Sequence, residues 1–134
     1  MTDISPTGRP ERLSVAHSTV DGIRVVTLRG DIDHDVKDVL TTALLPQDLD
    51  DDGPPPRVVA DLSGVTFLDS TGINVFVHVH HQVGAAGGWL RLAAAQEPVM
   101  RVVQLVGLDS VIPCRPTLEQ ALDPGTDTEV LRRP

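Results

Sequence analysis

The segment FLDSTG, residues 67–72, contains the residues best suited to chemistry, because an acid, two hydroxyls and a glycine follow an apolar run. An aspartic protease needs Asp-Thr-Gly or Asp-Ser-Gly, so that paired carboxylates share a proton. Here one extra residue separates Asp69 from the glycine, which argues against that enzyme class. On spacing alone, Asp69 or Ser70 caps a helix. The open alternative is a phosphate on Ser70 or Thr71, which the positive end of that helix would stabilise.

A second acidic segment, DIDHD at residues 31–35, places three carboxylates in alternation. Calcium loops use alternating acids at their first, third and fifth positions, but they also need Gly at the sixth and Glu at the twelfth. Those positions hold Val36 and Thr42. The simpler expectation is an acidic turn in which Asp33 or His34 caps the helix that follows.

The remaining candidates are histidines and one cysteine. His78 and His81 lie three residues apart and could share a helix face, but two imidazoles with no matching Cys or Glu make an incomplete zinc site. Cys114 has no second cysteine to pair with, so a small buried thiol is expected. We predict no metal site and no cofactor. A metal-dependent hydrolase built on residues 31–35 and the histidines is kept as the enzyme alternative.

The bulk composition sets limits on the function. The chain has 134 residues, 40% of them hydrophobic and 22% charged, which predicts one globular domain with an aliphatic core. A net charge of -8, with Lys37 as the only lysine, argues against nucleic acid as a partner. No secretory signal and no apolar run near 18 residues long is found, so we expect a soluble, cytoplasmic protein with no membrane contact.

Short β-branched runs alternate with helix-compatible segments, which indicates an α/β domain over residues 11–122 between flexible tails at 1–10 and 123–134. Strands are expected over residues 13–18, 23–29, 57–62, 89–93 and 111–114, with a turn at 20–22. Helices are expected over residues 35–45, from about Thr71 to the glycine cluster at 84–88, over 98–106, and over 118–122 with Thr117 as its cap. An acidic, proline-rich loop is expected over residues 46–56.

Three separated segments form a recognisable combination: GDID at residues 30–33, VVADLSGVTFLDSTGI at 58–73 and VGLDSVIPCRPTLEQAL at 106–122. Together they resemble the STAS domain family, specifically the bacterial anti-sigma factor antagonists, over residues 11–122. The resemblance implies an α/β fold with a mixed four-to-five-stranded sheet and about four helices packed mainly on one face. The order of elements expected from the pattern agrees with this fold.

The resemblance also implies a phosphorylatable hydroxyl just before the glycine of the FLDSTG segment. That residue is Thr71, with Ser70 as the second choice, although many relatives have Ser where this chain has Thr71. The surface around it would bind the partner. The residues expected on this surface are Asp31, Asp33, Asp69, Ser70, Gly72 and Asn74.

The implied partners are an anti-sigma factor, often a GHKL-type serine/threonine kinase, and a metal-dependent serine/threonine phosphatase. The unphosphorylated protein would bind the anti-sigma factor and free the sigma factor, while phosphate on Thr71 would repel that partner. This makes the chain a bacterial regulatory protein and not an enzyme, with a weak homodimer also considered. The alternative is a scaffold or transport-associated STAS subunit in which Thr71 is never phosphorylated.

Overall fold

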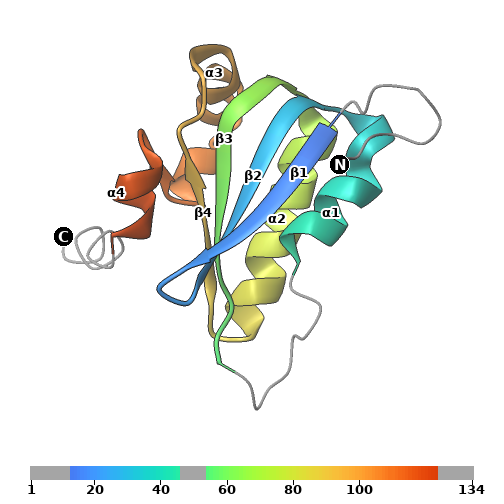
Figure 1. Ribbon diagram of the computed structural model, residues 1–134. Helices are drawn as coiled ribbons and strands as arrows, with labels where there is room; N and C mark the ends of the chain where they lie inside the picture. Colours follow the sequence, from blue (N-terminus) through green and yellow to red (C-terminus); the bar gives the residue numbers. More distant parts are fainter. Residues whose placement is uncertain (1–12, 46–53, 124–134) are drawn as a thin grey trace, which may run out of the picture.

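The computed structural model describes residues 13–45 and 54–123, and its centre is a five-stranded sheet (Figure 1). The strand order is β1-β2-β3-β4-β5, with β1 antiparallel to β2 and every other neighbouring pair parallel. The strands are β1 (Leu13–Val20), β2 (Ile23–Ile32), β3 (Arg57–Leu68), β4 (Trp89–Ala93) and β5 (Cys114–Arg115). Asp21 and Gly22, both at positive φ, make the predicted tight turn between β1 and β2.

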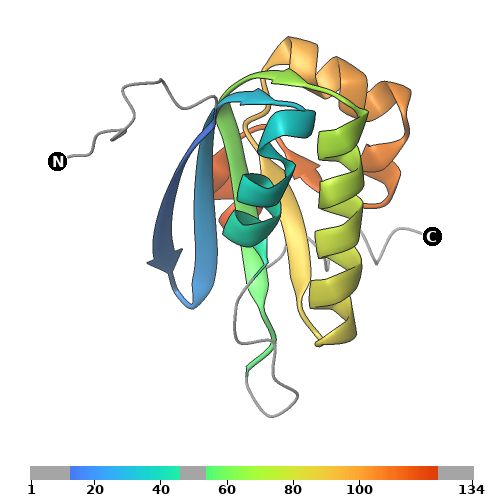
Figure 2. The same ribbon diagram turned by 90° about the vertical axis from the view of Figure 1, so that its right-hand side faces the viewer.

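The helices lie on both sides of this sheet, but most of them share one hydrophobic core. They are α1 (Lys37–Leu44), preceded by the 3₁₀ turn η1 (His34–Val36), α2 (Ser70–Ala85), α3 (Glu97–Leu105), the 3₁₀ turn η2 (Leu108–Ser110), and α4 (Leu118–Leu122). Figures 1 and 2 show α1 and α2 side by side on one face of the sheet, while α4 covers the other face. The predicted α/β fold class is confirmed.

The main core lies between the sheet and α1, α2 and α3, and it is aliphatic as expected. Leu28 and Ile32 of β2, Val58 of β3 and Leu40 of α1 are fully buried in it, and Phe76 of α2 is its large aromatic residue. Burial of this apolar surface also explains why the valine-rich segment of α2 is helical, because packing outweighs the weak helix propensity of valine.

The short helix α4 is held to the opposite face by a buried arginine. Arg91 of β4 donates hydrogen bonds to the carbonyl oxygens of Ala121 at 2.7 Å and Asp123 at 3.1 Å. Its guanidinium also lies over the Trp89 ring, 3.6 Å from the centroid. The predicted cap of α4 is confirmed, because the Thr117 hydroxyl accepts a hydrogen bond of 3.1 Å from the amide of Gln120.

The expected fifth strand is present, but its expected bounds, residues 111–114, are wrong because β5 covers only Cys114–Arg115. Gly107, at φ 79°, ends α3, and the chain then makes the η2 turn, after which Ile112 donates its amide to the Leu108 carbonyl at 2.9 Å. Only Cys114 and Arg115 pair with β4. The apolar pattern was misleading because Ile112 is buried as a core residue of a turn and not of a strand.

Other boundaries differ by a few residues. Strand β3 continues to Leu68, six residues beyond its expected end, so that Phe67 belongs to the strand. Helix α2 begins at Ser70, which places Thr71 at the second helical position and not at the first. The expected tail at 1–10, residues 124–134 of the expected tail at 123–134, and residues 46–53 of the expected loop lie outside the described residues. Within the described part of the chain, no helix is long and apolar enough to cross a membrane.

Candidate functional site

The two acidic segments predicted from the sequence lie side by side at the carboxyl ends of β2 and β3. In the parallel pairing of these strands, Asp31 is opposite Phe67 and Ile32 is opposite Leu68. The amide of Asp69 then donates a hydrogen bond of 3.2 Å to the carbonyl oxygen of Ile32. This bond ties the start of α2 to the end of β2, in the part of a parallel sheet where binding sites commonly occur.

Asp69 caps α2, as one of the two interpretations of the sequence proposed. Its carboxylate accepts hydrogen bonds from the amides of Thr71 at 2.9 Å and Gly72 at 3.3 Å. Ser70 is exposed and is the first helical residue, so it does not cap the helix. Thr71 is half-buried in the first turn, and Asn74 is exposed one turn later. The cap therefore fixes the backbone that carries both hydroxyls.

Gly72 is buried, and its lack of a side chain allows α2 to approach the sheet. A Cβ added to Gly72 would lie 2.5 Å from Cγ2 of Ile32 and would also collide with Leu68. Any larger residue would push the first turn of α2 away from β2 and β3. Gly72 thus contributes to the site by positioning Thr71.

Two of the acids in residues 31–35, Asp31 and Asp33, accept hydrogen bonds within the domain. The Asp31 carboxylate accepts a hydrogen bond of 2.7 Å from the Thr66 hydroxyl of β3. Asp33 caps the η1 turn, because its carboxylate accepts a hydrogen bond of 3.0 Å from the amide of Asp35. The expected acidic turn is therefore present, but Asp33 caps η1 and not α1, which begins after Val36 without a side-chain cap. Across residues 13–45 and 54–123, no three His, Cys, Asp or Glu side chains are grouped so that they could hold a metal ion.

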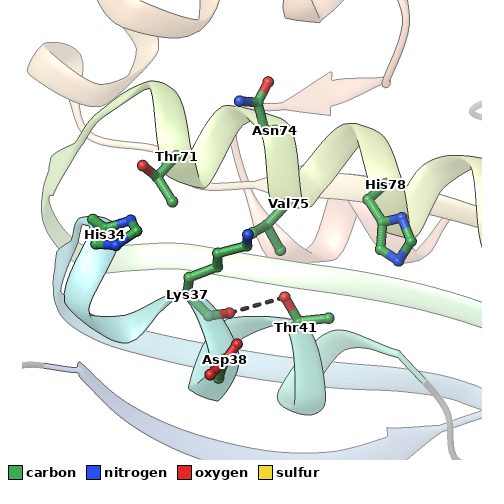
Figure 3. A pocket seen from close by; sticks show the side chains of 8 residues that line it. All are labelled: His34, Lys37, Asp38, Thr41, Thr71, Asn74, Val75 and His78. Atoms are coloured by element: carbon green, nitrogen blue, oxygen red, sulfur yellow. Dashed lines mark hydrogen bonds between the residues drawn. The ribbon is translucent and has the colours of Figure 1, made fainter.

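A groove of about 500 Å³ runs between α1 and α2 and reaches the first turn of α2 (Figure 3). Thr71 lines one end of it, and Lys37 extends its side chain from α1 towards α2. The residues that line the groove are His34, Lys37, Asp38, Thr41, Thr71, Asn74, Val75 and His78. Lys37 therefore places a positive charge in the same groove as Thr71. The neighbouring surface, here called the acidic rim, is formed by Asp31, Asp33, Asp69, Ser70 and Asn74.

Comparison with known proteins identifies the fold and its relatives. A family model described as the STAS domain matches residues 14–121. The chain belongs to the STAS domain family. The anti-sigma-B factor antagonist of Bacillus subtilis (strain 168) is 34% identical to this STAS domain over 87 residues, which cover 65% of this chain and 76% of that protein.

Two further relatives are also named anti-sigma factor antagonists. The anti-sigma F factor antagonist of Paenibacillus polymyxa is 25% identical over 96 residues, covering 69% of this chain and 77% of that protein. A crystal structure of an anti-sigma factor antagonist from Mycobacterium paratuberculosis matches with a TM-score of 0.71 and 32% identity, covering 85% of this chain and 94% of that one. The sequence resemblance to the STAS family is confirmed.

The structure of this STAS domain adds residues that sequence analysis missed. Phe67, at the end of β3 and two residues before Asp69, has 49% of its surface exposed. Once β3 is known to continue to Leu68, the exposure of Phe67 fits a strand, because Leu68 is buried and neighbouring side chains point to opposite faces. Lys37 and His34, which line the groove, could be found only once α1 was placed beside α2.

The histidines and the cysteine of the STAS domain lie away from the FLDSTG segment or at its margin. His78 and His81 are both exposed on α2, and only His78 lines the groove. Desolvation, and to a smaller degree the nearby His81, lowers the pKa of His80. Burial raises the pKa of the Cys114 thiol to about 11, with a smaller contribution from Asp109. Cys114 is half-buried, close to the small buried thiol that was expected.

Proposed function

We propose that this STAS domain is an anti-sigma factor antagonist, a regulatory binding protein and not an enzyme, that is controlled by phosphorylation of Thr71. The observation that carries the proposal is the position of Thr71: a hydroxyl in the capped first turn of α2, beside the acidic turn that ends β2. The names of the relatives in Bacillus subtilis and Mycobacterium paratuberculosis support the same function. It would act in the bacterial cytoplasm, where sigma factors meet RNA polymerase.

In the unphosphorylated state, the rim around α2 binds the anti-sigma factor and the sigma factor is released. The rim presents the acids and polar groups expected from the sequence, and Phe67 adds an exposed aromatic side chain of the kind that often anchors an interface. The partner-facing side chains are Asp31, Asp33, Asp69, Ser70, Asn74 and Phe67. Gly72 supports this surface from beneath, because it is buried.

Phosphorylation requires a GHKL-type kinase, which is the anti-sigma factor itself in this proposal. The Thr71 hydroxyl oxygen attacks the γ-phosphorus of ATP, ADP leaves, and a base of the kinase takes the hydroxyl proton. The phosphorylated product carries about -1.5 to -2 elementary charges more than the unmodified protein. This charge lies close to the Asp69 carboxylate, which accepts a hydrogen bond from the amide of Thr71. A partner that complements the acidic rim through its own shape and hydrogen bonds then meets an excess of negative charge, and the complex dissociates. A metal-dependent phosphatase restores the hydroxyl by hydrolysis.

The proposal is tested with the cognate anti-sigma factor and three variants. Incubation with ATP and mass mapping should place one phosphate on Thr71, and Thr71→Ser should still be labelled. Thr71→Ala should bind the anti-sigma factor with or without ATP, whereas Thr71→Glu should lose binding. Phosphate on another residue, or equal binding by the Ala and Glu variants, would remove the switch. Failure of Thr71→Ser alone would show a kinase selective for threonine.

A further inference from the structure

The groove between α1 and α2 contains a cation directed at the face of α2 that carries Thr71. Thr71 and Val75 are four residues apart, so they lie one above the other on the same helix face. Figure 3 shows the Lys37 side chain extending from α1 towards α2, and Lys37, Thr71 and Val75 line the same groove. Lys37 is the only lysine in the chain. Among the residues that the structure describes, its ammonium group forms no ion pair with a carboxylate.

The helix end itself is poorly available to a phosphate on Thr71. The Asp69 carboxylate already accepts hydrogen bonds from the amides of Thr71 and Gly72. A phosphate that approached these amides would have to displace Asp69 and would meet its negative charge. A positively charged group that pairs with the phosphate must therefore lie away from the start of α2. The groove offers one, because Lys37 and Thr71 line the same cavity.

We propose that Lys37 receives the phosphate when Thr71 is phosphorylated, so that a new ion pair crosses the groove and ties α1 to α2. This inference rests on the proposed phosphorylation of Thr71 and adds a structural consequence to it. The phosphorylated domain differs from the unphosphorylated one in added charge and also in a closed groove. Lys37 is then withdrawn from any partner that contacts this face.

The experiment installs phosphothreonine at position 71 during protein synthesis, so that no kinase is needed. The phosphate resonance is followed by ³¹P NMR as a function of pH at low salt. A neighbouring ammonium favours the dianion, so Lys37→Gln should raise the titration midpoint, which is ordinarily near pH 6, by about 0.5 pH unit. Lys37→Arg should keep the midpoint of the parent. The other ionisable groups near this face, His34, Asp38, Asp69 and His78, are present in every variant.

The matched control is Arg57→Gln, which removes one positive charge at the opposite end of β3. Its midpoint should equal that of the parent, and 1 M salt should shrink the effect of Lys37→Gln because the pair is exposed to solvent. An unchanged midpoint in Lys37→Gln would overturn the inference, as would an equal change in Arg57→Gln. Neither result depends on a kinase. A failure of Thr71 to accept phosphate from the kinase would count against the proposed function alone.

Discussion

Gly72 of α2 lies directly against Ile32 at the end of β2, so closely that a Cβ on Gly72 would be 2.5 Å from Cγ2 of Ile32. The contact is possible because Gly72, in the first helical turn after the cap residue Asp69, has no side chain. It sets how far the first turn of α2 stands above the sheet. The glycine of the FLDSTG segment is therefore a packing requirement of the site.

Replacement of Gly72 by Ala should destabilise the fold. The Leu68 side chain can rotate away, but the β-branched Ile32 has a stiff side chain, so the added methyl forces α2 outward. We expect a loss of about 1 to 3 kcal/mol in the free energy of unfolding, measured by urea denaturation. The control is Gly84→Ala in the same helix, where an added Cβ meets nothing within 4 Å. That variant should be stabilised by up to about 1 kcal/mol, and the same sign for both variants would contradict the argument.

The Asp69 cap can be separated from the Asp69 charge by two substitutions. Asp69→Ala removes the acceptor of both amide hydrogen bonds and should cost about 1 kcal/mol of stability. Asp69→Asn retains a good cap without the charge, so it should cost only a few tenths of a kcal/mol. Urea unfolding of both proteins decides the point. If Asn costs as much as Ala, the charge stabilises the helix end and the hydrogen-bond account is incomplete.

Much of this fold follows from local signals in the sequence. Strand β4 was predicted to its exact bounds because a short apolar run is enclosed by glycine and by a break. The cap by Thr117 was predicted because a capping box is a local pattern. The bounds of the fifth strand were predicted wrongly, because the pairing of Leu92 with Cys114 depends on where two distant segments meet. Local patterns do not contain that information.

In the candidate site, too, some features follow from local spacing in the sequence and others depend on how distant segments pack. The capping role of Asp69 and the turn formed by Asp33 could be predicted from spacing, because each needs only a few neighbouring residues. The position of Lys37 opposite Thr71 could not, because it depends on the packing of α1 against α2. The exposure of Phe67 depended on how far β3 continues, and element boundaries are the weakest part of any prediction from sequence.

Phe67 should matter for partner binding and little for stability. Because 49% of its surface is exposed, Phe67→Ala should leave the free energy of unfolding nearly unchanged. Loss of an aromatic anchor should weaken the anti-sigma factor complex by about 10-fold to 100-fold in Kd, measured by calorimetry. The control is Val20→Ala, which removes a 39% exposed apolar residue at the hairpin, the far end of β2. Equal Kd values for the two variants would place the interface elsewhere.

Cys114 should be an unreactive thiol in the folded protein. Burial raises its pKa from 9.0 to about 11, so near neutral pH the thiolate population falls about 100-fold relative to an ordinary cysteine. Alkylation by iodoacetamide at pH 8 should be slower by about that factor in the folded protein than in urea. The rate in the folded protein should rise with pH until about pH 11.

The same shift has a consequence for stability with a definite sign. A group whose pKa is higher in the folded state favours the protonated folded form, so its contribution is complete below about pH 9 and is lost as the pH rises towards 11. Cys114→Ser, whose hydroxyl does not ionise in this range, should lose less stability between these pH values than the parent does. Urea denaturation of both proteins at pH 8 and pH 10.5 measures the difference. Parallel losses in the two proteins, or an alkylation rate in the folded parent equal to that in urea, would show that the Cys114 thiol is not buried as the structure has it.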